Sequence, residues 1–448
     1  MSERIKIINF GPIEEVDIEI KKLTVFIGPQ AGGKSTVAKL VFLFKSLKGI
    51  LTKPYFEYID KWANEKNASF SYDQDKLIKY INGEIKNKFN RIFGNETSKQ
   101  DFKIEYTYNN QQIFQFVKKP YGEELIVPSG FKALLSGLDQ FISNDLDKIT
   151  VPKSMTENAK NSTTLEKYIK TSTAKFTVSN LVESYFTEVF TPVFIPAGRG
   201  AFSILSDQIG ILGQDQVDDL LISFLRTIKS LIKNINSFSD FLEHLNPFIS
   251  DSSNLESALK NSFDIADRIL RGKYAYADGE SRIYTSEDEY VKLNFASSGQ
   301  QEAIWIIFIC LDLISSGASN NFVVVEEPEA HLYPNAQFEM VKLIANLLNL
   351  PERNNQVIIT THSPYILSSL NCLLMAGMTS ELQSIKVEEM ISKEYWLNSE
   401  MSNAYKIDRK SRSIIDEELS IIRIDEIDEI SETINEIQNK LIQIIYEP

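Results

Sequence analysis

The sequence has few cysteines and no long apolar run, and each shortage excludes a class of protein. Only Cys310 and Cys372 occur among 448 residues, too few for the disulfide framework of a small secreted domain. The longest apolar run, residues 303–314, is interrupted by Asp312 and is too short to cross a bilayer. The N-terminus lacks the apolar core of a signal peptide. We therefore expect a soluble, cytoplasmic protein without a membrane segment.

Basic residues are fewer than acidic residues. The chain has 47 Lys and Arg against 61 Asp and Glu, a formal net charge of −14. This balance disfavours a surface that binds nucleic acid over its whole extent and favours a protein partner. One helical segment carries Lys76, Lys79, Lys86 and Lys88, which form either a local basic track or an ordinary solvated helix face. With 43% hydrophobic residues the chain can build a large core, and its length predicts two or three lobes.

The first fifty residues predict strand, strand, loop and helix. Apolar and polar residues alternate from 5 to 20 around a Gly-Pro turn, the pattern of half-buried strands. The apolar run Leu23–Ile27 predicts a strand covered on both faces. After the glycine-rich residues 28–33, apolar residues recur at helical spacing, and Gly49 is the expected helix stop.

The rest of the chain predicts further hairpins, strands and helices. Hairpins are expected at 102–116 and 274–295, strands at 192–196, 322–326 and 356–360, and helices within 205–270 and at 300–314. The absence of sustained heptads excludes a long coiled-coil arm. Residues 425–445 predict an acidic amphipathic helix, either docked on its own domain or paired with a partner helix.

A P-loop pattern follows the buried strand. It reads Gly28-Pro29-Gln30-Ala31-Gly32-Gly33-Lys34-Ser35, and Thr36 continues the binding segment. Its glycines let backbone N–H groups converge on phosphate oxygens, and the helix N-terminus adds partial positive charge. We expect Lys34 to reach the β- and γ-phosphates and Ser35 to bind Mg²⁺. The pattern predicts a site for a nucleoside triphosphate and Mg²⁺.

Two carboxylates end a later buried strand, Val323-Val324-Val325-Glu326-Glu327. A strand that ends in two acids directs one toward the metal and the next toward the attacking water. We therefore predict Glu326 as a metal ligand and Glu327 as the catalytic base.

Three further motifs complete a resemblance to the ABC-type ATPase heads of SMC-like and OLD-like proteins (AAA_15 type). Ala296-Ser297-Ser298-Gly299-Gln300 is similar to the ABC signature, with Ser298 in place of its first glycine. Glu326–Pro334 resembles the Walker B and D-loop block, and Ile359–Pro364 resembles the H-loop. The resemblance extends from the P-loop to Pro364. It departs from the family near 192–196, where no glutamine marks the Q-loop.

The resemblance implies that two heads sandwich ATP, as a dimer or a higher homo-oligomer. The signature residues Ser297, Ser298, Gly299 and Gln300 of one head then contact the γ-phosphate in another, and His362 contacts it as a catalytic residue. A Ser-Gly pair alone usually caps a helix. Arg199 either reads phosphate or a neighbouring head, or pairs with acids on the surface. His331 either has a role at the site or only packs the D-loop.

The implied fold is an α/β P-loop NTPase of the ABC ATPase-head type, with a mixed sheet, an antiparallel β subdomain and a helical lobe. The expected parts are a split head (1–50, 192–204 and 272–415), an inserted mixed lobe (51–191), a helical lobe (205–271) and a C-terminal acidic helix (416–448). The P-loop and its acids must meet at one magnesium ion, so we expect the lobes to be insertions into one head.

Several branches of the superfamily are disfavoured. A transporter cassette does not need the long interval between Ser35 and Ser297, and SMC proteins carry coiled coils there. A Toprim nuclease domain needs an Asp-x-Asp, and none follows Tyr365. The chain resembles the stand-alone ATPases of bacterial anti-phage systems such as PARIS and Septu. This implies slow, regulatory hydrolysis that controls a separately encoded effector, such as a nuclease, in response to a phage trigger protein. The alternative is a DNA-binding repair or clamp ATPase.

Overall fold

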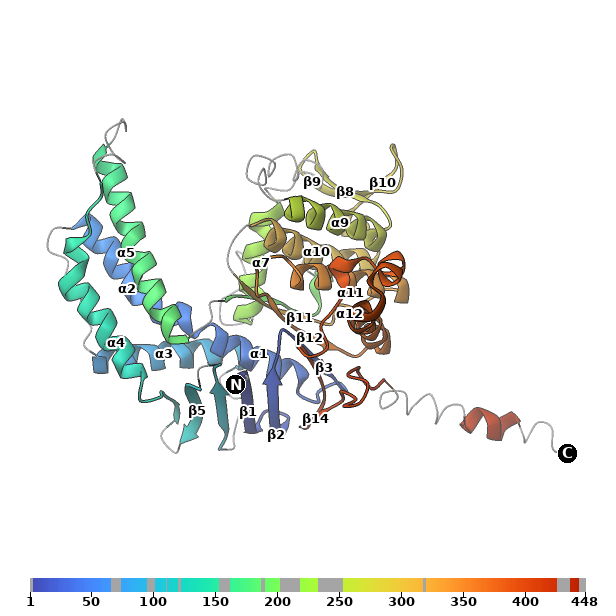
Figure 1. Ribbon diagram of the computed structural model, residues 1–448, viewed down its shortest axis with the longest axis horizontal. Coiled ribbons are helices and arrows are strands. Elements are labelled where there is room, and N and C mark those ends of the chain that lie inside the picture. Colours follow the sequence, from blue (N-terminus) through green and yellow to red (C-terminus); the bar gives the residue numbers. More distant parts are fainter. Residues whose placement is uncertain are drawn as a thin grey trace. The chain divides into compact units, whose positions relative to one another are not determined.

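The computed structural model describes most of the chain. The described residues are 3–65, 74–94, 101–109, 111–119, 122–152, 162–186, 190–201, 218–232, 253–316, 320–424 and 436–442. The chain divides into two compact units, which we treat one at a time (Figure 1). Unit 1 comprises Met1–Glu19 and Lys39–Thr191, and unit 2 comprises Ile20–Ala38 and Pro192–Pro448.

Unit 1 is built on antiparallel strands. These are β1 (Glu3–Phe10), β2 (Ile13–Ile20), β4 (Lys103–Thr107), β5 (Ile113–Lys119) and β6 (Gly122–Ile126), in the order β6-β5-β4-β1-β2. Pairing of β1 with β4, β4 with β5 and β5 with β6 is antiparallel. Ile5 and Ile7 of β1 are fully buried and lie opposite Tyr106 and Ile104. The hairpins predicted around the Gly-Pro turn and at 102–116 are confirmed.

Helices cover this sheet and extend from it. They are α2 (Leu47–Asn64), α3 (Gln74–Phe93), α4 (Phe131–Gln140) and α5 (Ser162–Phe186), with short η1 (Phe141–Asp145) and η2 (Leu146–Lys148) after α4. The ring of Phe89 on α3 lies 5.3 Å from Phe10 and 4.8 Å from Phe116, so α3 packs on the sheet. Helices α2 and α5 lie side by side (Figure 1).

The predicted helix stop at Gly49 is wrong. The helix after the P-loop, α1 (Lys34–Lys45), ends earlier, and Gly49 lies inside α2. Leu51, Tyr55 and Ile59 of α2 are buried at helical spacing beyond the glycine. Their burial outweighs the cost of about 1 kcal/mol that glycine imposes on a helix interior.

Unit 2 contains the parallel strands on which the P-loop lies. Its strands are β3 (Leu23–Ile27), β7 (Thr191–Ile195), β11 (Asn321–Glu326), β12 (Gln356–Thr361), β13 (Ser402–Asp408) and β14 (Lys410–Ser413), in the order β14-β13-β3-β12-β11-β7. Strand β3 is parallel to β12 and β13, and β12 is parallel to β11. In the register, Glu326 faces Thr360 and Ile27 faces Thr361. The carboxyl ends of β3, β11 and β12 therefore meet at one edge, where ligands bind in such sheets.

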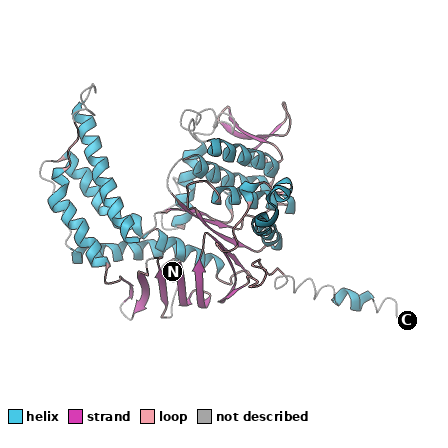
Figure 2. Cartoon of the chain, viewed as in Figure 1, coloured by secondary structure: helices cyan, strands magenta, loops and turns pink. Residues whose placement is uncertain are grey.

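The remaining elements of unit 2 are mostly helices. They are α7 (Asp219–Ile232), α9 (Ser253–Leu270), α10 (Ser298–Ser315), α11 (Pro334–Leu348) and α12 (Pro364–Met390), with short η4 (Arg199–Ala201), η5 (Leu293–Phe295) and η6 (Lys393–Tyr395). A separate antiparallel sheet contains β8 (Lys273–Ala277), β9 (Glu280–Tyr284) and β10 (Tyr290–Lys292). Asp278 and Gly279 join β8 to β9 with positive φ angles, as a tight hairpin requires. Figure 2 shows this small sheet at the top of the view, above the helices of unit 2. The second predicted hairpin is confirmed.

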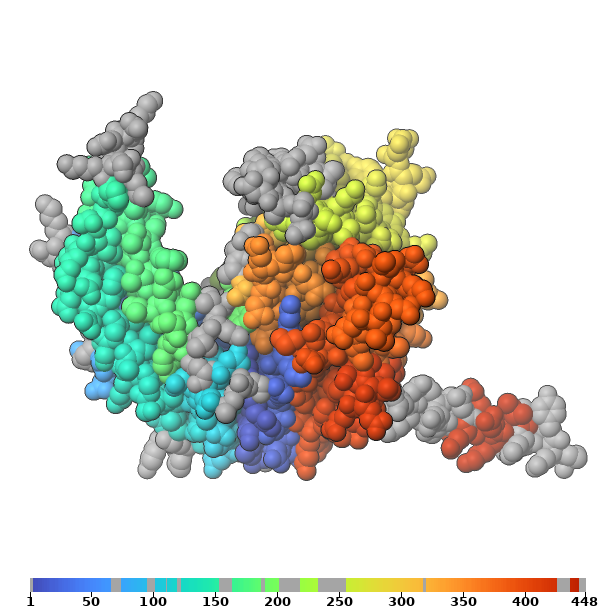
Figure 3. Space-filling model, in the orientation of Figure 1, coloured from blue at the N-terminus to red at the C-terminus, as the bar shows by residue number. Residues whose placement is uncertain are grey.

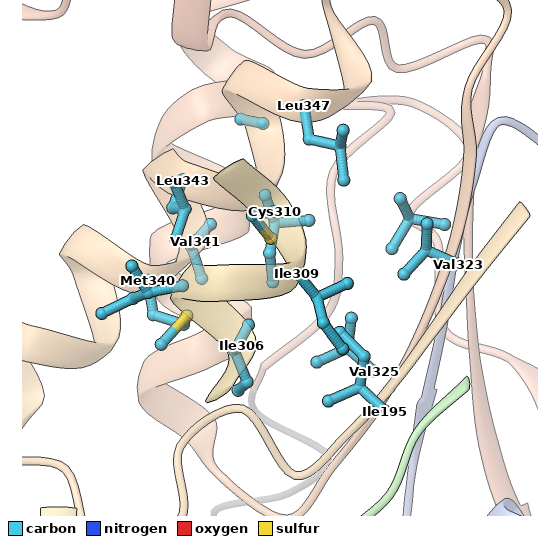
Figure 4. Close-up of a cluster of buried hydrophobic side chains, with 14 of the residues drawn as sticks. Ile195, Ile306, Ile309, Cys310, Val323, Val325, Met340, Val341, Leu343 and Leu347 are labelled. Carbon is cyan, nitrogen blue, oxygen red and sulfur yellow. The ribbon is translucent and has the colours of Figure 1, made fainter. Parts of the chain in front are cut away.

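Helix α10 lies at the centre of the unit 2 core. Its Ile306, Ile309 and Cys310 pack between Met340 of α11 and Val325 of β11 (Figure 4). Each fully buried isoleucine contributes about 1.5–3 kcal/mol relative to an exposed one. This packing fixes α10 against the strands, and its first residues lie at the border of the core. Figure 3 shows the outer face of this unit, coloured from yellow to orange-red.

The predicted α/β architecture, with a mixed sheet, a separate antiparallel sheet and helices, is confirmed. No helix in the described residues is long and apolar enough to span a membrane. The expected C-terminal acidic helix (416–448) is wrong at its start, because residues 416–424 form turns and an isolated bridge between Ile415 and Ile422 instead of a helix. Of the remainder, only residues 436–442 are described, and they are helical and exposed. Residues 205–217 and 233–252 of the expected helical lobe lie outside the described residues. The domain boundaries remain a prediction.

Candidate nucleotide site

The P-loop closes around its own lysine. Strand β3 ends at Ile27 and α1 begins at Lys34, so the loop occupies residues 28–33. The Lys34 ammonium donates hydrogen bonds to the carbonyl oxygens of Gly28 and Pro29, each at 2.8 Å, and the side chain is buried. Gly28 and Ala31 have φ angles of 149° and 59°, outside the range that side chains favour. The local backbone is therefore shaped as a phosphate-binding turn requires.

Two P-loop glycines are also required by packing against β13. A Cβ atom on Gly28 would lie 2.2 Å from the carbonyl oxygen of Ile407, and one on Gly32 would lie 2.7 Å from it. The Arg409 N–H donates to the Gly32 carbonyl at 3.0 Å. Sequence reasoning assigned these glycines to phosphate access alone and did not find β13. The alternation of Tyr405 and Ile407 with Lys406 and Asp408 is the signal that could have found this strand.

The predicted metal ligand Glu326 is buried at the end of β11. Its Oε2 accepts a hydrogen bond from the Ala197 N–H at 3.2 Å, whereas Oε1 is buried without a hydrogen-bond partner among the described residues. A buried polar group without a hydrogen bond lowers the stability of the fold by about 1–3 kcal/mol, and a ligand that bonds to this oxygen would remove that cost. A cation is the partner that a carboxylate oxygen takes most readily.

The predicted base Glu327 lies next to the H-loop histidine. Its φ is 44°, rare for a residue with a side chain, and its N–H donates to the Thr360 carbonyl at 2.8 Å. Its Oε1 is 3.4 Å from His362 Nε2, and His362 Nδ1 is 3.5 Å from Lys34 Nζ. The Glu327 side chain is 41% exposed and the His362 side chain 31% exposed. Both can therefore be reached by a substrate.

Glu329, which sequence reasoning missed, holds the H-loop in place. Its Oε1 accepts hydrogen bonds from the Thr361 hydroxyl and the His362 N–H, each at 2.7 Å. Its Oε2 is buried, and no described residue forms a hydrogen bond with it. The signal was the third acid in the block that begins at Glu326. Glu329 therefore fixes the backbone from which the His362 ring extends.

Carboxylates outnumber cationic side chains in this site. Burial lowers the pKa of Lys34, and the charges of Glu327, Glu329 and Glu326 oppose that shift. Burial also lowers the pKa of Arg199. Four carboxylates act on Arg199 electrostatically, those of Glu302, Glu326, Glu329 and Glu327. A triphosphate approaching this site needs an accompanying cation to offset the negative charge.

The available donor set fits Mg²⁺ bound together with phosphates. Ser35 is exposed at the start of α1, and Glu326 presents its unpartnered oxygen. No group of three or more His, Cys, Asp and Glu in the described residues forms a metal site by itself. Mg²⁺ prefers oxygen ligands and usually binds through one or two protein groups plus substrate phosphates and waters. Ser35 and Glu326 match this preference.

The signature residues begin α10 and contact the D-loop. Ser297 is the N-cap, and its hydroxyl donates to Gln300 Oε1 at 2.9 Å within a capping box. A Cβ atom on Gly299 would lie 2.6 Å from the His331 carbonyl oxygen, so the glycine allows the D-loop to approach. His331 is exposed with a φ of 58°. The helix-cap role of Ser297 is thus present, and Ser297 and Ser298 are exposed to a second molecule.

The structure brings some predicted residues together and separates others. Lys34, Glu326, Glu327 and His362 converge at the edge where β3, β11 and β12 end. Among described residues, the hydrogen bonds found for Ser297 and Gln300 stay within the signature and its helix or reach Leu270. Arg199 pairs with an acid, Glu302, as one of the two interpretations held, but both residues are buried instead of lying among the surface acids that it named.

Comparison with known proteins gives a family and several distant structures. The model of the AAA ATPase domain family matches residues 1–367. No curated protein matches the chain. An SMC head bound to the C-winged helix domain of ScpA is similar at 12% identity and a TM-score of 0.38, over 92% of this chain and 96% of that chain. The SMC head domain from Thermotoga maritima is similar at 10% identity and a TM-score of 0.35, over 92% and 98%. The recombination mediator protein RecF is similar at 11% identity and a TM-score of 0.30, over 92% and 98%.

Proposed function

The chain belongs to the AAA ATPase domain family. From this membership we propose that it binds ATP with Mg²⁺ and hydrolyses ATP to ADP and phosphate. The observation that carries the proposal is the convergence at one sheet edge of Lys34, the buried unpartnered oxygen of Glu326, and Glu327 beside His362. Phosphoryl transfer to water needs a phosphate-binding loop and lysine, a metal-side carboxylate and a group that positions the water.

Each residue has a defined task in this reaction. Lys34 and the backbone N–H groups of residues 28–33 bind the phosphates, and Ser35 and Glu326 hold the metal. Mg²⁺, when bound, neutralises charge on the β- and γ-phosphate oxygens. The Glu327 carboxylate orients the attacking water and takes its proton. His362, whose Nδ1 lies 3.5 Å from Lys34 Nζ, contacts the γ-phosphate beside that lysine.

Two substitutions test the ATPase assignment. Glu327→Gln keeps the size of the side chain and removes its basicity, so turnover should fall about 10²-fold or more while ATP binding persists. Lys34→Ala should weaken ATP binding itself. Glu388→Gln, an exposed acid on α12, is the matched control and should behave as wild type. Normal turnover by Glu327→Gln would reassign the base, and a wild-type chain without turnover would refute the assignment.

We further propose that two heads sandwich ATP, as a dimer or within a higher homo-oligomer. In this arrangement Ser297, Ser298 and Gly299 of one chain meet the triphosphate held by another. The exposure of both serines supports this, as do Phe295 and Tyr333, aromatic side chains that are 80% and 77% exposed beside the signature and the D-loop. Ser298→Arg should preserve ATP binding by the monomer and abolish both ATP-dependent association, measured by light scattering, and hydrolysis.

The biological role we propose is a cytoplasmic sensor and scaffold in anti-phage defence. ATP turnover would be slow, and would control a separately encoded effector such as a nuclease, released by a phage trigger protein. The net charge of −14 supports a protein partner. Purification from the native operon should recover a neighbouring gene product. Failure to recover one, together with unchanged phage sensitivity on deletion, would refute this role.

The alternative is a repair or clamp ATPase that acts on DNA. It requires a basic surface, and Lys76 and Lys79 of α3 are exposed. However, Lys86 is 3.1 Å from Glu123, and Lys88 lies over the Phe42 ring at 5.3 Å. A gel-shift assay with and without ATP separates the two functions, because DNA binding here predicts ATP dependence and a steep loss of affinity with salt.

A further inference from the structure

Arg199 binds the main chain of both predicted carboxylate residues. It begins the short turn η4 after β7, and its side chain is fully buried. Nη1 donates to the carbonyl oxygens of Pro196 and Glu326, each at 2.6 Å, and Nη2 donates to the carbonyl oxygen of Glu327 at 3.0 Å. One planar guanidinium therefore fixes the spacing between consecutive carbonyl groups at the end of β11.

Glu302 connects this arginine to the helix that carries the signature. Glu302 is buried near the start of α10, and its Oε2 accepts a hydrogen bond from the Arg199 N–H at 2.9 Å. Its Oε1 accepts from the Gly200 N–H at 2.8 Å. Arg199 Nε is 3.4 Å from Glu302 Oε2 and donates to the Glu302 carbonyl at 3.3 Å. Helix α10 and the end of β11 are thus joined through one buried ion pair.

Arg199 helps to hold Glu327 in a backbone conformation that a residue with a side chain rarely adopts. A non-glycine residue with a φ of 44° persists only where its surroundings hold it in place. At Glu327 the N–H bonds to Thr360, and the carbonyl accepts from Arg199 and from the Ala330 N–H at 3.1 Å. Lysine in place of Arg199 would keep the charge and lose the planar set of donors.

We propose that Arg199 is a positioning residue for ATP hydrolysis, which fixes Glu326 and Glu327 and joins them to α10 through Glu302. Ser297, the N-cap of that helix, lies five residues before Glu302. When the signature residues bind a nucleotide and the N-terminus of α10 moves, the Arg199–Glu302 ion pair transmits the movement to Glu326 and Glu327. The proposal rests on the proposed ATPase function and adds the residues that couple the signature helix to the acids.

The first experiment compares two single variants of the full chain. Arg199→Lys should lower kcat about a hundredfold, because a displacement of about 1 Å at a reacting group has an effect of this size. ATP affinity, measured with a non-hydrolysable analogue, and KM should stay within about threefold, since the P-loop is unchanged. Arg353→Lys is the matched control, because Arg353 also donates to an α10 carbonyl, that of Leu313 at 2.9 Å, at the other end of the helix. It should keep the wild-type kcat.

A double variant separates positioning from simple stability. Arg199→Met with Glu302→Gln removes both buried charges together, which buried ion pairs often tolerate, and keeps an acceptor oxygen beside the main-chain N–H groups of Arg199 and Gly200. We expect its melting temperature to recover relative to Arg199→Met alone while kcat stays low. A double variant that regains both the melting temperature and kcat would overturn the proposal, as would a wild-type kcat in Arg199→Lys.

Hydrogen exchange decides the proposal independently of turnover. In the absence of nucleotide, Arg199→Lys should speed exchange of the Ala330 amide, which donates to the Glu327 carbonyl that Arg199 holds, and of the Glu327 amide, which donates to Thr360 from the same strained residue. Unchanged exchange at these amides would overturn the inference. A wild-type chain that binds ATP without hydrolysing it would instead refute the proposed function, and the exchange result would still stand.

Discussion

At the scale of single residues, Gly28 shows how the absence of a side chain sets the geometry of the site. It has a φ of 149°, and any Cβ atom would lie 2.2 Å from the Ile407 carbonyl oxygen. Gly83 is the useful contrast, since it lies inside α3 with no atom within 4 Å of a Cβ position. The same substitution should therefore have opposite effects at the two positions.

We expect Gly28→Ala to abolish ATP binding and to lower stability by at least about 1–3 kcal/mol, because both overlap with β13 and backbone strain oppose it. Gly83→Ala should instead stabilise the chain by about 0.5–1 kcal/mol, because alanine favours a helix interior. Thermal melts and calorimetric ATP titrations measure both effects. A Gly28→Ala protein with wild-type melting and affinity would show that β13 does not constrain the P-loop.

The two cysteines should differ in reactivity. Burial raises the pKa of the Cys310 thiol to about 12, so it stays protonated and shielded near neutral pH. Cys372 is exposed at the surface, and the partial burial of its side chain raises the pKa of its thiol. Because the thiolate is the nucleophile, iodoacetamide should modify Cys372 faster as pH rises from about 7 to 9 and leave Cys310 intact until unfolding. Intact-mass spectrometry of wild type and Cys372→Ser measures this, and rapid native labelling of Cys310 would contradict the core around α10.

At the scale of elements, the D-loop and the H-loop are joined by the carboxylate of Glu329. Glu329→Ala should lower kcat and the melting temperature together, because it leaves the Thr361 hydroxyl and the His362 N–H without their acceptor, at a cost of about 1–3 kcal/mol. Glu329→Gln keeps one carbonyl oxygen and should lose less. Steady-state kinetics and thermal melts of both variants test this. Equal, wild-type behaviour of the two would exclude Glu329 as the support of His362.

Elements with strong local periodicity could be predicted, and contacts between distant segments could not. The run Leu23–Ile27, the P-loop with its helix and the Asp278-Gly279 hairpin each carry their signal within a few residues. No local pattern shows that the Ile407 carbonyl lies against Gly28, or that Glu302 faces Arg199. Such contacts depend on strand register and helix packing. The same limit explains the error at Gly49, where tertiary burial of α2 overrides helix propensity.

In the candidate site, too, residues in local motifs could be predicted and contacts between distant segments could not. Lys34, Ser35, Glu326, Glu327 and His362 were found because their motifs are short and contiguous. Glu329 and Glu302 were missed because each acts through backbone groups of another segment. Sequence reasoning thus located the groups expected to touch ATP and overlooked the groups that hold them.

At the scale of the whole molecule, every residue that we propose to contact the nucleotide belongs to unit 2. These residues come from segments distant in sequence, so binding should couple them energetically. A ligand present at a hundred times its Kd stabilises the state that binds it by about 2.7 kcal/mol. That stabilisation should be seen in the segments that form the site, and amide hydrogen exchange reports it by segment.

We expect ATP and Mg²⁺ to slow amide exchange of Glu327→Gln protein at residues 28–36, 326–331 and 360–363. Exchange in the α2 and α5 helices of unit 1 should change little, because none of the proposed ligands lies there. Lys34→Ala protein under the same conditions is the control and should show no protection. Protection confined to the P-loop would mean that the acids and the H-loop do not join one nucleotide site, since a triphosphate bound with its metal must contact all three segments.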